Sequence, residues 1–182
     1  MKIRNMIASA LLLLGLLGMN SHAAEQLYEI ELVLFAQEMP STEVFDQTES
    51  LIKWPREVFE QASFPQLDSE RITLHESVAK LADGLEYQIV MHVAWIQAVV
   101  ANRLGDAVQI SNSEGTVNGF FRLQRGNLIH MVVDIEYAPE PYAGGVFYRL
   151  NEKRRFKLNE THYLDHPKFG ILARVSPVKP EQ

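Results

Sequence analysis

The stretch Y-E-I-E-L-V-L-F, residues 28–35, carries the clearest structural pattern in this chain. One of its faces is apolar throughout and consists of Tyr28, Ile30, Leu32 and Leu34. The other face begins with Glu29 and Glu31 and becomes apolar at Val33 and Phe35. This alternation is typical of a β-strand, in which successive side chains point to opposite faces. Because one end is apolar on both faces, we expect the strand to lie in the middle of a sheet.

Other segments farther along the chain show the alternation, or the β-branched and aromatic composition, of strands: 87–100, a short piece at 108–110, 117–124, 128–137, 146–158 and 169–175. Arg125-Gly126-Asn127 supplies turn residues between two of them. We therefore expect 117–124 and 128–137 to form a hairpin.

One clear helix is expected, at 74–81, with Gly84 as a stop signal just beyond it. Residues 36–73 hold prolines among charged residues and are interpreted as mostly loop with short helical pieces, in which Trp54 would be buried. The predicted fold class is α+β. A single domain over residues 24–178 would hold a mostly antiparallel sheet of five or six strands and few short helices.

The N-terminus has the layout of a secretory signal peptide. Lys2 and Arg4 precede an apolar run, and Ser21-His22-Ala23 offers a small-x-small cleavage site. The run is shorter than the roughly 20 residues of a membrane span, and the chain has no cysteine that could carry a lipid. We expect residues 1–23 to be removed, with cleavage after Ala24 as the alternative. The product would be a soluble exported protein without a membrane anchor, ending in a short tail at 179–182.

The mature chain is acidic. The full chain has 17 basic and 23 acidic residues, and loss of Lys2 and Arg4 leaves 15 basic residues and a net charge of −8. Such a protein lacks the basic surface that nucleic acid requires, so nucleic-acid binding is not expected. Since cysteine is absent, neither disulfides nor thiolate metal sites can form.

Residues 160–170, E-T-H-Y-L-D-H-P-K-F-G, hold the densest group of ionisable side chains. His162 and His166 have the spacing of zinc-binding helices, but Pro167 disfavours a helical conformation for the residue before it. In an extended segment their Cα atoms would lie about 13 Å apart, at about 3.3 Å per residue, too far to share one metal without a sharp turn. A metal-dependent enzyme using His162, Asp165 and His166 is therefore the minor hypothesis. We interpret Asp165 as a turn residue that accepts local backbone N–H groups.

The segment K-R-R-F-K, residues 153–157, is the only dense basic cluster. Arg155 and Lys157 lie on one strand face and Arg154 on the other. The cluster is either a solvated edge strand protected by charge or a seat for peptide carboxylates, which arginine binds with paired donors. Glu160 is expected to pair with Arg154 or Arg155.

Two further side chains are singled out in segment 87–100. Trp95 stands between apolar neighbours and is interpreted as a core residue, with stacking on a sugar ring as the less favoured alternative. His92 lies on the opposite face and is expected to satisfy a hydrogen bond.

Taken together, several segments resemble one known family: Y-E-I-E-L-V-L-F at 28–35, Trp54-Pro55, H-V-A-W-I-Q at 92–97, G-N-L-I-H-M at 126–131 and R-R-F-K-L-N-E-T-H-Y-L-D-H-P-K-F-G at 154–170. In order and spacing they are similar to the CsiV family of periplasmic peptidoglycan-binding proteins of Gram-negative bacteria. The resemblance spans nearly the whole mature chain. The chain departs from the family's usual hairpin pattern R-Y-L-H, since it has Asn127-Leu128-Ile129-His130 there.

The resemblance implies a periplasmic, non-enzymatic protein without a cofactor. It would bind peptidoglycan and support a class A penicillin-binding protein together with that synthase's outer-membrane lipoprotein activator. A pure protein–protein adaptor is the alternative. The candidate residues for binding peptidoglycan or a partner are Arg154, Arg155, Lys157, His162, Tyr163, Asp165, His166, Trp95 and His130.

Overall fold

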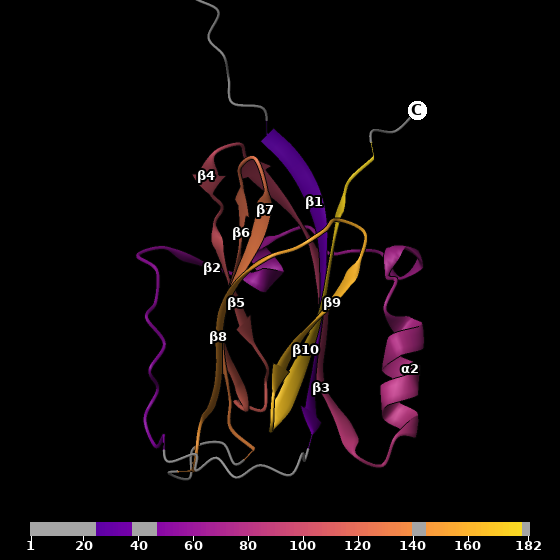
Figure 1. Cartoon of the computed structure of the whole chain (residues 1–182), viewed down its shortest axis with the longest axis vertical. Coiled ribbons are helices and arrows are strands. Elements are labelled where there is room, and N and C mark those ends of the chain that lie inside the picture. Colours follow the sequence, from indigo (N-terminus) through magenta and orange to yellow (C-terminus); the bar gives the residue numbers. More distant parts are fainter. Residues whose placement is uncertain (1–24, 38–46, 140–144, 180–182) are drawn as a thin grey trace, which may run out of the picture.

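The computed structural model describes residues 25–37, 47–139 and 145–179. Two β-sheets pack face to face in this part of the chain, and the one α-helix described there lies outside them (Figure 1). The predicted signal peptide and most of the predicted tail lie outside the described residues.

The first sheet has four strands in the order β3-β1-β10-β9, all antiparallel. Their bounds are Glu25–Gln37 for β1, Tyr87–Val100 for β3, Thr161–His166 for β9 and Phe169–Pro177 for β10. The strand predicted from residues 28–35 is therefore confirmed as β1, and it lies between two neighbours as its two-sided apolar end predicted.

The second sheet has six strands in the order β2-β5-β6-β7-β8, and β4 pairs with β6 beside this path. Among them only the pairing of β2 with β5 is parallel. The bounds are Val58–Glu60 for β2, Arg103–Leu104 for β4, Ala107–Ser111 for β5, Val117–Arg125 for β6, Ile129–Tyr137 for β7 and Tyr148–Arg155 for β8. The predicted hairpin is confirmed by β6 and β7, which are joined by a short turn.

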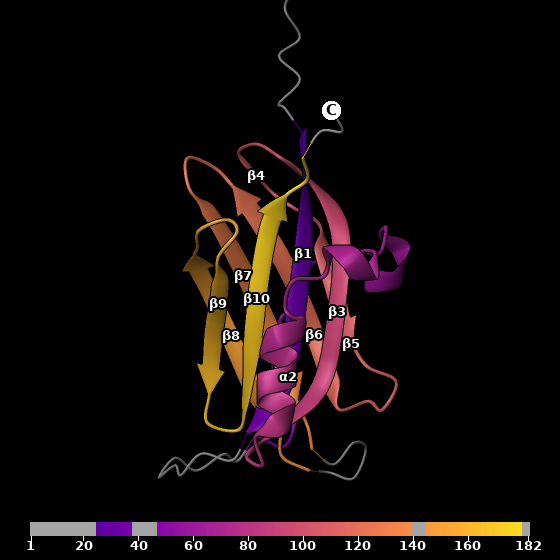
Figure 2. The same ribbon diagram turned by 90° about the vertical axis from the view of Figure 1, so that its right-hand side faces the viewer.

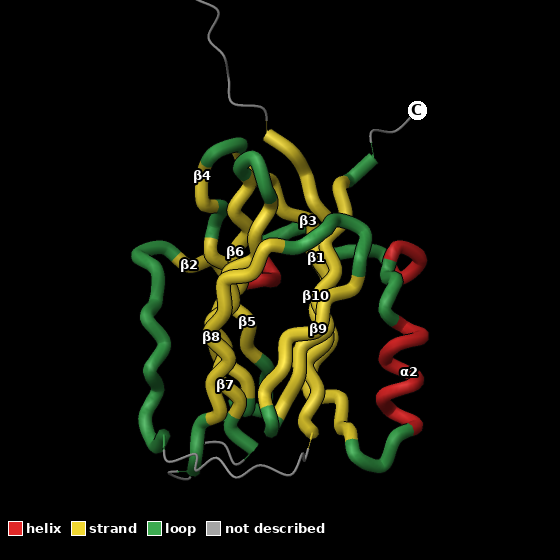
Figure 3. Tube along the Cα trace, in the orientation of Figure 1, coloured by secondary structure: helices red, strands yellow, loops and turns green. Residues whose placement is uncertain are grey.

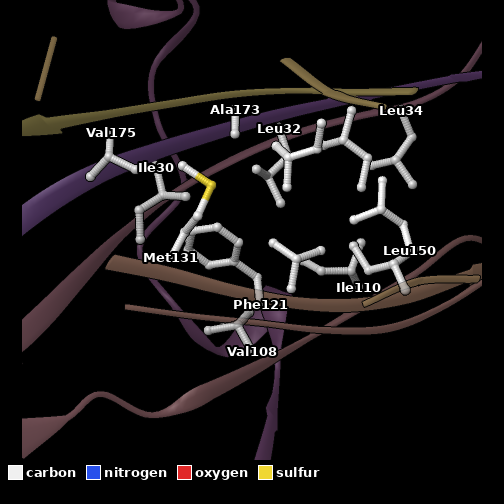
Figure 4. Packing of buried hydrophobic residues seen from close by; sticks show 14 of the residues in the cluster. Ile30, Leu32, Leu34, Val108, Ile110, Phe121, Met131, Leu150, Ala173 and Val175 are labelled. Carbon is white, nitrogen blue, oxygen red and sulfur yellow. The ribbon is translucent and has the colours of Figure 1, made fainter. Parts of the chain in front are cut away.

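The hydrophobic core fills the space between the two sheets. Ile30, Leu32 and Leu34 of the first sheet face Phe121 and Met131 of the second, and all five are at most 1 % exposed (Figure 4). The α+β prediction with one sheet of five or six strands is wrong in this respect. The fold is mostly β with two sheets, because the apolar face of β1 packs on a second sheet.

The helix α2, His75–Asp83, lies along the outer face of the four-stranded sheet (Figure 2). It confirms the helix predicted at 74–81. Leu74 precedes it and is only 2 % exposed, so the entry to the helix is anchored in the protein. The predicted short helical pieces are 3-10 turns at Gln61–Ser63 and Ser69–Arg71.

Residues 47–57, here called the strap, run along the outer face of the six-stranded sheet before entering β2 (Figure 3). The Trp54 ring lies 6.0 Å from the ring of Phe120 on that face. Trp54 nevertheless remains 41 % exposed, so the prediction that its indole is buried is wrong. The reason is that the strap covers the sheet from outside and has no further layer above it.

Candidate functional site

Most of the sequence-predicted site residues meet on one side of the sandwich. Strand β8 is an edge of the six-stranded sheet, and β9 is an edge of the four-stranded sheet. The turn between them contains Asn159, whose φ of 63° lies in the left-handed region. The strand predicted over 146–158 therefore ends at Arg155, and the chain crosses from one sheet to the other.

Arg154 joins the two sheet edges. Its Nε donates to the Glu152 carboxylate at 2.6 Å, and its Nη1 donates to the backbone carbonyl of Tyr163 on β9 at 2.6 Å. The predicted pairing of Glu160 with Arg154 or Arg155 is wrong, because the Glu160 carboxylate lies 3.4 Å from Nζ of Lys157. Arg154 is thus occupied within the protein, which makes it a structural residue rather than a free donor.

We expect Arg154→Ala to lower the free energy of unfolding by about 1 kcal/mol, the usual contribution of partly exposed charged hydrogen bonds. Urea denaturation measures this, with Arg155→Ala as the control on the same strand. The control should change the free energy of unfolding by less than about 0.5 kcal/mol. Equal effects of the two substitutions would show that the Arg154 contacts do not hold the edges together.

The three side chains of the hypothetical metal site do not converge. His162 and His166 flank the buried Leu164 on one face of β9, whereas Asp165 lies on the other face. The His162 Nε2 lies 3.0 Å from the Lys157 carbonyl, and the Nδ1 of His166 accepts from the Lys168 backbone N–H. Among the described residues no group of three or more His, Asp or Glu side chains is placed to hold a metal ion.

Asp165 belongs to a side-chain network and not to a turn, so the turn interpretation is wrong. Tyr163 donates its hydroxyl to the Asp165 carboxylate at 2.6 Å, and Gln37 Nε2 donates to the same carboxylate at 3.1 Å. Burial and the hydrogen bond to Asp165 raise the pKa of Tyr163 to about 12, so its hydroxyl stays neutral. The Tyr163 ring stacks on Phe35 at 6.0 Å, directly over Gly170, where a Cβ would approach Phe35 to 2.5 Å.

Trp95 is a core residue, as the favoured interpretation predicted. It is fully buried, its ring meets Phe121 edge to face at 5.7 Å, and its Nε1 donates to Gln97 at 3.3 Å. A side chain in this position cannot stack on a sugar. His92 satisfies a hydrogen bond as predicted, with Nε2 2.8 Å from the Glu31 carboxylate on β1.

An open basic surface lies on the outer face of the six-stranded sheet, where two rows of side chains cross three paired strands. We call it the basic face; it consists of Arg122, Gln124, His130, Val132, Lys153 and Arg155. Lys153 and Arg155 are exposed, and their side chains have no hydrogen bond or ion pair with any residue that the structure describes. Of the predicted residues, it brings together His130 and Arg155; sequence reasoning missed Arg122 and Gln124, because only the strand register places them there.

The neighbouring part of the same sheet face is closed. Glu136 is 2 % exposed and accepts hydrogen bonds from Gln47 Nε2 at 2.7 Å and from the Leu51 N–H at 2.8 Å, both in the strap. Asp134, also 2 % exposed, accepts two hydrogen bonds from the Arg149 guanidinium. These two acids are therefore covered and hydrogen-bonded, whereas Lys153 and Arg155 of the basic face are left open. Arg122, the third cation of that face, donates its Nε to the Gly105 carbonyl at 2.8 Å.

The tip of the β6–β7 hairpin adjoins the basic face. A hollow of about 310 Å³ is lined there by Asn102, Gln124, Gly126, Asn127, Leu128 and His130. Leu128 is 50 % exposed at the tip. Asn127 and Leu128, where the chain departs from the family's hairpin pattern, therefore lie at the rim of the basic face.

A second concave site lies at the end of the sandwich where β1 ends and β3 begins. We call it the end pocket; it has a volume of about 560 Å³ and is lined by Ala36, Gln37, Leu85, Glu86, Tyr87, Gln88, Tyr137, Pro139, Tyr148 and Lys168. Gln37 connects its wall to Tyr163 and Asp165. The Tyr148 ring also lies 5.8 Å from the ring of His166. Tyr163, Asp165 and His166 thus contact residues that line this pocket without being part of the lining themselves.

A β-sandwich with two exposed cations that have no partner among the described residues, and with a pocket lined by tyrosines, has the features of a binding module. A sequence model of a family described as the peptidoglycan-binding protein CsiV matches residues 6–178, and the chain belongs to that family of peptidoglycan-binding proteins. No curated protein sequence matches the chain significantly. In the described residues, no helix is long and apolar enough to cross a membrane.

Proposed function

We propose that this protein binds peptidoglycan through the basic face, with Lys153 and Arg155 gripping the carboxylates of the peptide stems. It acts in the periplasm as a soluble, non-catalytic accessory protein. In that role it supports a class A penicillin-binding protein and the outer-membrane lipoprotein that activates this synthase. The observation that carries the proposal is the pair of exposed cations on the outer sheet face of an acidic protein, neither of which has a hydrogen-bond or ion-pair partner among the described residues.

The chemistry of the basic face suits this ligand. Arg155 presents a planar guanidinium that can donate two parallel hydrogen bonds to one carboxylate, and Lys153 adds a second charge one row away. Gln124 and His130 lie on the row of Arg155 and can bond to peptide amide groups. Because these groups stand on paired strands and not on a loop, their spacing is set before the ligand arrives.

The hairpin tip explains how this member can differ from its family. A basic and an aromatic residue at the positions of Asn127 and Leu128 would extend the basic face over the adjoining hollow. With Asn127 and Leu128 at these positions, the surface that can contact peptidoglycan is smaller. Binding to the cell wall therefore depends more strongly on Lys153 and Arg155. Removing either cation should therefore have a large effect.

The strap favours a protein partner as the second contact. Leu51, Trp54 and Phe59 are 55 %, 41 % and 42 % exposed in and just after the strap, so three large apolar side chains stand on the surface along this segment. A surface of this kind suits docking to the synthase or to its activator. A pure adaptor function would use this surface alone, without the basic face.

Co-sedimentation of residues 24–182 with purified sacculi over a range of salt concentrations tests the proposal. We expect Arg155→Glu to weaken binding at least tenfold, since one charged hydrogen-bonded contact contributes about 1.5–3 kcal/mol. Lys80→Glu changes the net charge equally but lies on the exposed side of α2, and it should bind like the unchanged protein. Binding should also fall with salt, because exposed charges are screened.

Two outcomes would contradict the proposal. If the unchanged protein stays in the supernatant at low salt, direct wall binding fails and the adaptor function is favoured. If Lys80→Glu weakens pelleting as much as Arg155→Glu, binding to sacculi depends on the net charge of the protein, and the basic face is not the binding site. Arg154→Ala should still pellet, because that guanidinium is already engaged with Glu152 and Tyr163.

A further inference from the structure

The end pocket differs chemically from the basic face. Three tyrosines from both sheets line it, namely Tyr87, Tyr137 and Tyr148. Its charged side chains are Glu86 and Lys168, one of each sign, so the lining carries no net charge. A cavity of about 560 Å³ falls within the range of roughly 300–1,000 Å³ typical of small-molecule sites. Its composition therefore favours a neutral ligand that is apolar on one side and polar on the other.

Sugar rings have this character. The axial C–H groups of a pyranose form an apolar face that packs on aromatic rings, while its hydroxyl and N-acetyl groups need hydrogen-bond partners. Tyr87 is 37 % exposed, so part of its side chain is accessible to a ligand. Gln88 is exposed beside it, and Lys168 adds a charged donor to the lining.

Contacts with neighbouring side chains fix the positions of the residues that line the pocket. Tyr87 meets Phe35 edge to face at 5.6 Å, which sets the direction of its ring. The Tyr137 and Tyr148 rings lie 6.5 Å apart on paired strands. Gln37 is 4 % exposed and is fixed by its bonds to Asp165 and to the His166 carbonyl. The aromatic and amide groups are therefore positioned by neighbours that the ligand does not displace.

We propose that the end pocket binds the N-acetylated hexosamine rings of a glycan strand, as a second site separate from the basic face. This inference rests on the proposed function and assigns glycan and peptide stem to different ends of the molecule. His130 of the basic face and Tyr137 of the pocket are seven residues apart on β7, which is about 23 Å at about 3.3 Å per residue. A single ligand that reaches both sites at once must therefore be a long, polymeric molecule.

Titration with the tetrasaccharide of N-acetylglucosamine, which carries no peptide, tests the pocket by NMR or calorimetry. We expect the unchanged protein to bind it with a Kd on the order of 1 mM or tighter. Tyr87→Ala should weaken this binding at least tenfold, and Gln88→Ala severalfold. Phe59→Ala removes an aromatic of similar exposure elsewhere and should bind the sugar unchanged, as should Arg155→Glu.

The outcomes separate the two proposals. If the protein pellets with sacculi but shows no response to the tetrasaccharide at millimolar concentration, the pocket inference fails and the basic-face proposal stands. If Tyr87→Ala and Gln88→Ala both bind the tetrasaccharide like the unchanged protein, the sugar binds elsewhere and the pocket inference is likewise overturned. Loss of pelleting in Arg155→Glu supports the basic face as the peptide site. Retained tetrasaccharide binding in that variant, together with weakened binding in Tyr87→Ala, supports the pocket as the sugar site.

Discussion

Glu31→Ala should lower the free energy of unfolding by about 3 kcal/mol, because it leaves several buried hydrogen-bond donors without an acceptor. Glu31 is 3 % exposed and its carboxylate accepts from the Thr73 N–H and hydroxyl at 2.9 Å and from the Leu74 N–H at 3.0 Å. The same carboxylate lies 2.8 Å from Nε2 of His92. These bonds fasten the beginning of α2 to the centre of the four-stranded sheet, so their loss should loosen the whole outer layer.

Urea denaturation at pH 7 measures the effect, and Glu29→Ala is the matched control. Glu29 lies two residues earlier on the same face of β1, and its one ion pair within the described part of the chain is with the partly exposed Arg71. The control should cost at most about 1 kcal/mol. If both substitutions cost the same, the carboxylate of Glu31 does not organise the helix entry as the contacts indicate.

The stability that Glu31 supplies should disappear in acid. Burial alone would raise its pKa, but the hydrogen bonds from His92, Thr73 and Leu74 outweigh burial and lower the pKa below the ordinary value of 4.5. As pH falls, the unfolded chain is therefore protonated first. The contribution is fully present above about pH 4.5 and is lost as pH falls through the lower pKa of the folded state. The difference between the unchanged protein and Glu31→Gln should shrink over that window, which urea titrations at several pH values would show.

Gly119→Ala should be about as damaging, at about 3 kcal/mol or more, because there is no space for a methyl group. A Cβ at this position would lie 2.3 Å from the carbonyl oxygen of Asp134 and 2.6 Å from the Cα of Ile135. Both are backbone atoms of β7, to which β6 is paired, and Gly119 also pairs with Ile110 on β5. The strands on both sides prevent β6 from moving away.

Thermal or urea denaturation of Gly119→Ala should show this loss beside Gly126→Ala. At Gly126, in the turn after β6, the nearest neighbour of an added Cβ would be the Leu128 carbonyl at an ordinary 3.7 Å. The second substitution should change the free energy of unfolding by less than about 1 kcal/mol. Near-unchanged stability of Gly119→Ala would mean that β6 and β7 can separate without cost, contrary to the paired register.

The locally encoded elements were predictable. The alternation in 28–35, the composition of 87–100 and the turn residues Arg125-Gly126-Asn127 act within a few residues, and each corresponds to a strand or turn of the structure. The same holds for the helix after Leu74, whose apolar spacing is visible without any tertiary contact. The segments that carried the family resemblance were also sufficient, since the family match confirms it.

The strand β9 was missed because its sequence obeys no strand pattern. Its ionisable residues and the following Pro167 suggested a turn, yet β10 on one side and the Arg154 contact on the other keep it extended. The polar side chains are tolerated because β9 is an edge strand, where Tyr163 and Asp165 bond to Gln37 at the rim of the molecule. Only the partner strands could reveal this.

The candidate sites were predictable only in part. The basic cluster of β8 and the histidine of β7 were visible as residue types, but their placement in adjacent rows depends on the pairing register. Arg154 and Arg155 are neighbours in sequence, but in the structure Arg154 joins the two sheet edges, whereas the side chain of Arg155 is exposed. The end pocket draws on five separate segments and has no signal in any one of them.

The sequence by itself determined which stretches are strands, which faces of them are apolar and to which family the chain belongs, because those properties are written in residue spacing and local motifs. The tertiary structure alone decided that the strands divide into two sheets, that the strap and α2 cover their outer faces, and that Lys153 and Arg155 of β8 have no partner among the described residues. An apolar strand face gains the same free energy against a helix or a second sheet, so its pattern does not specify the partner. That choice depends on how all the faces pack together at once.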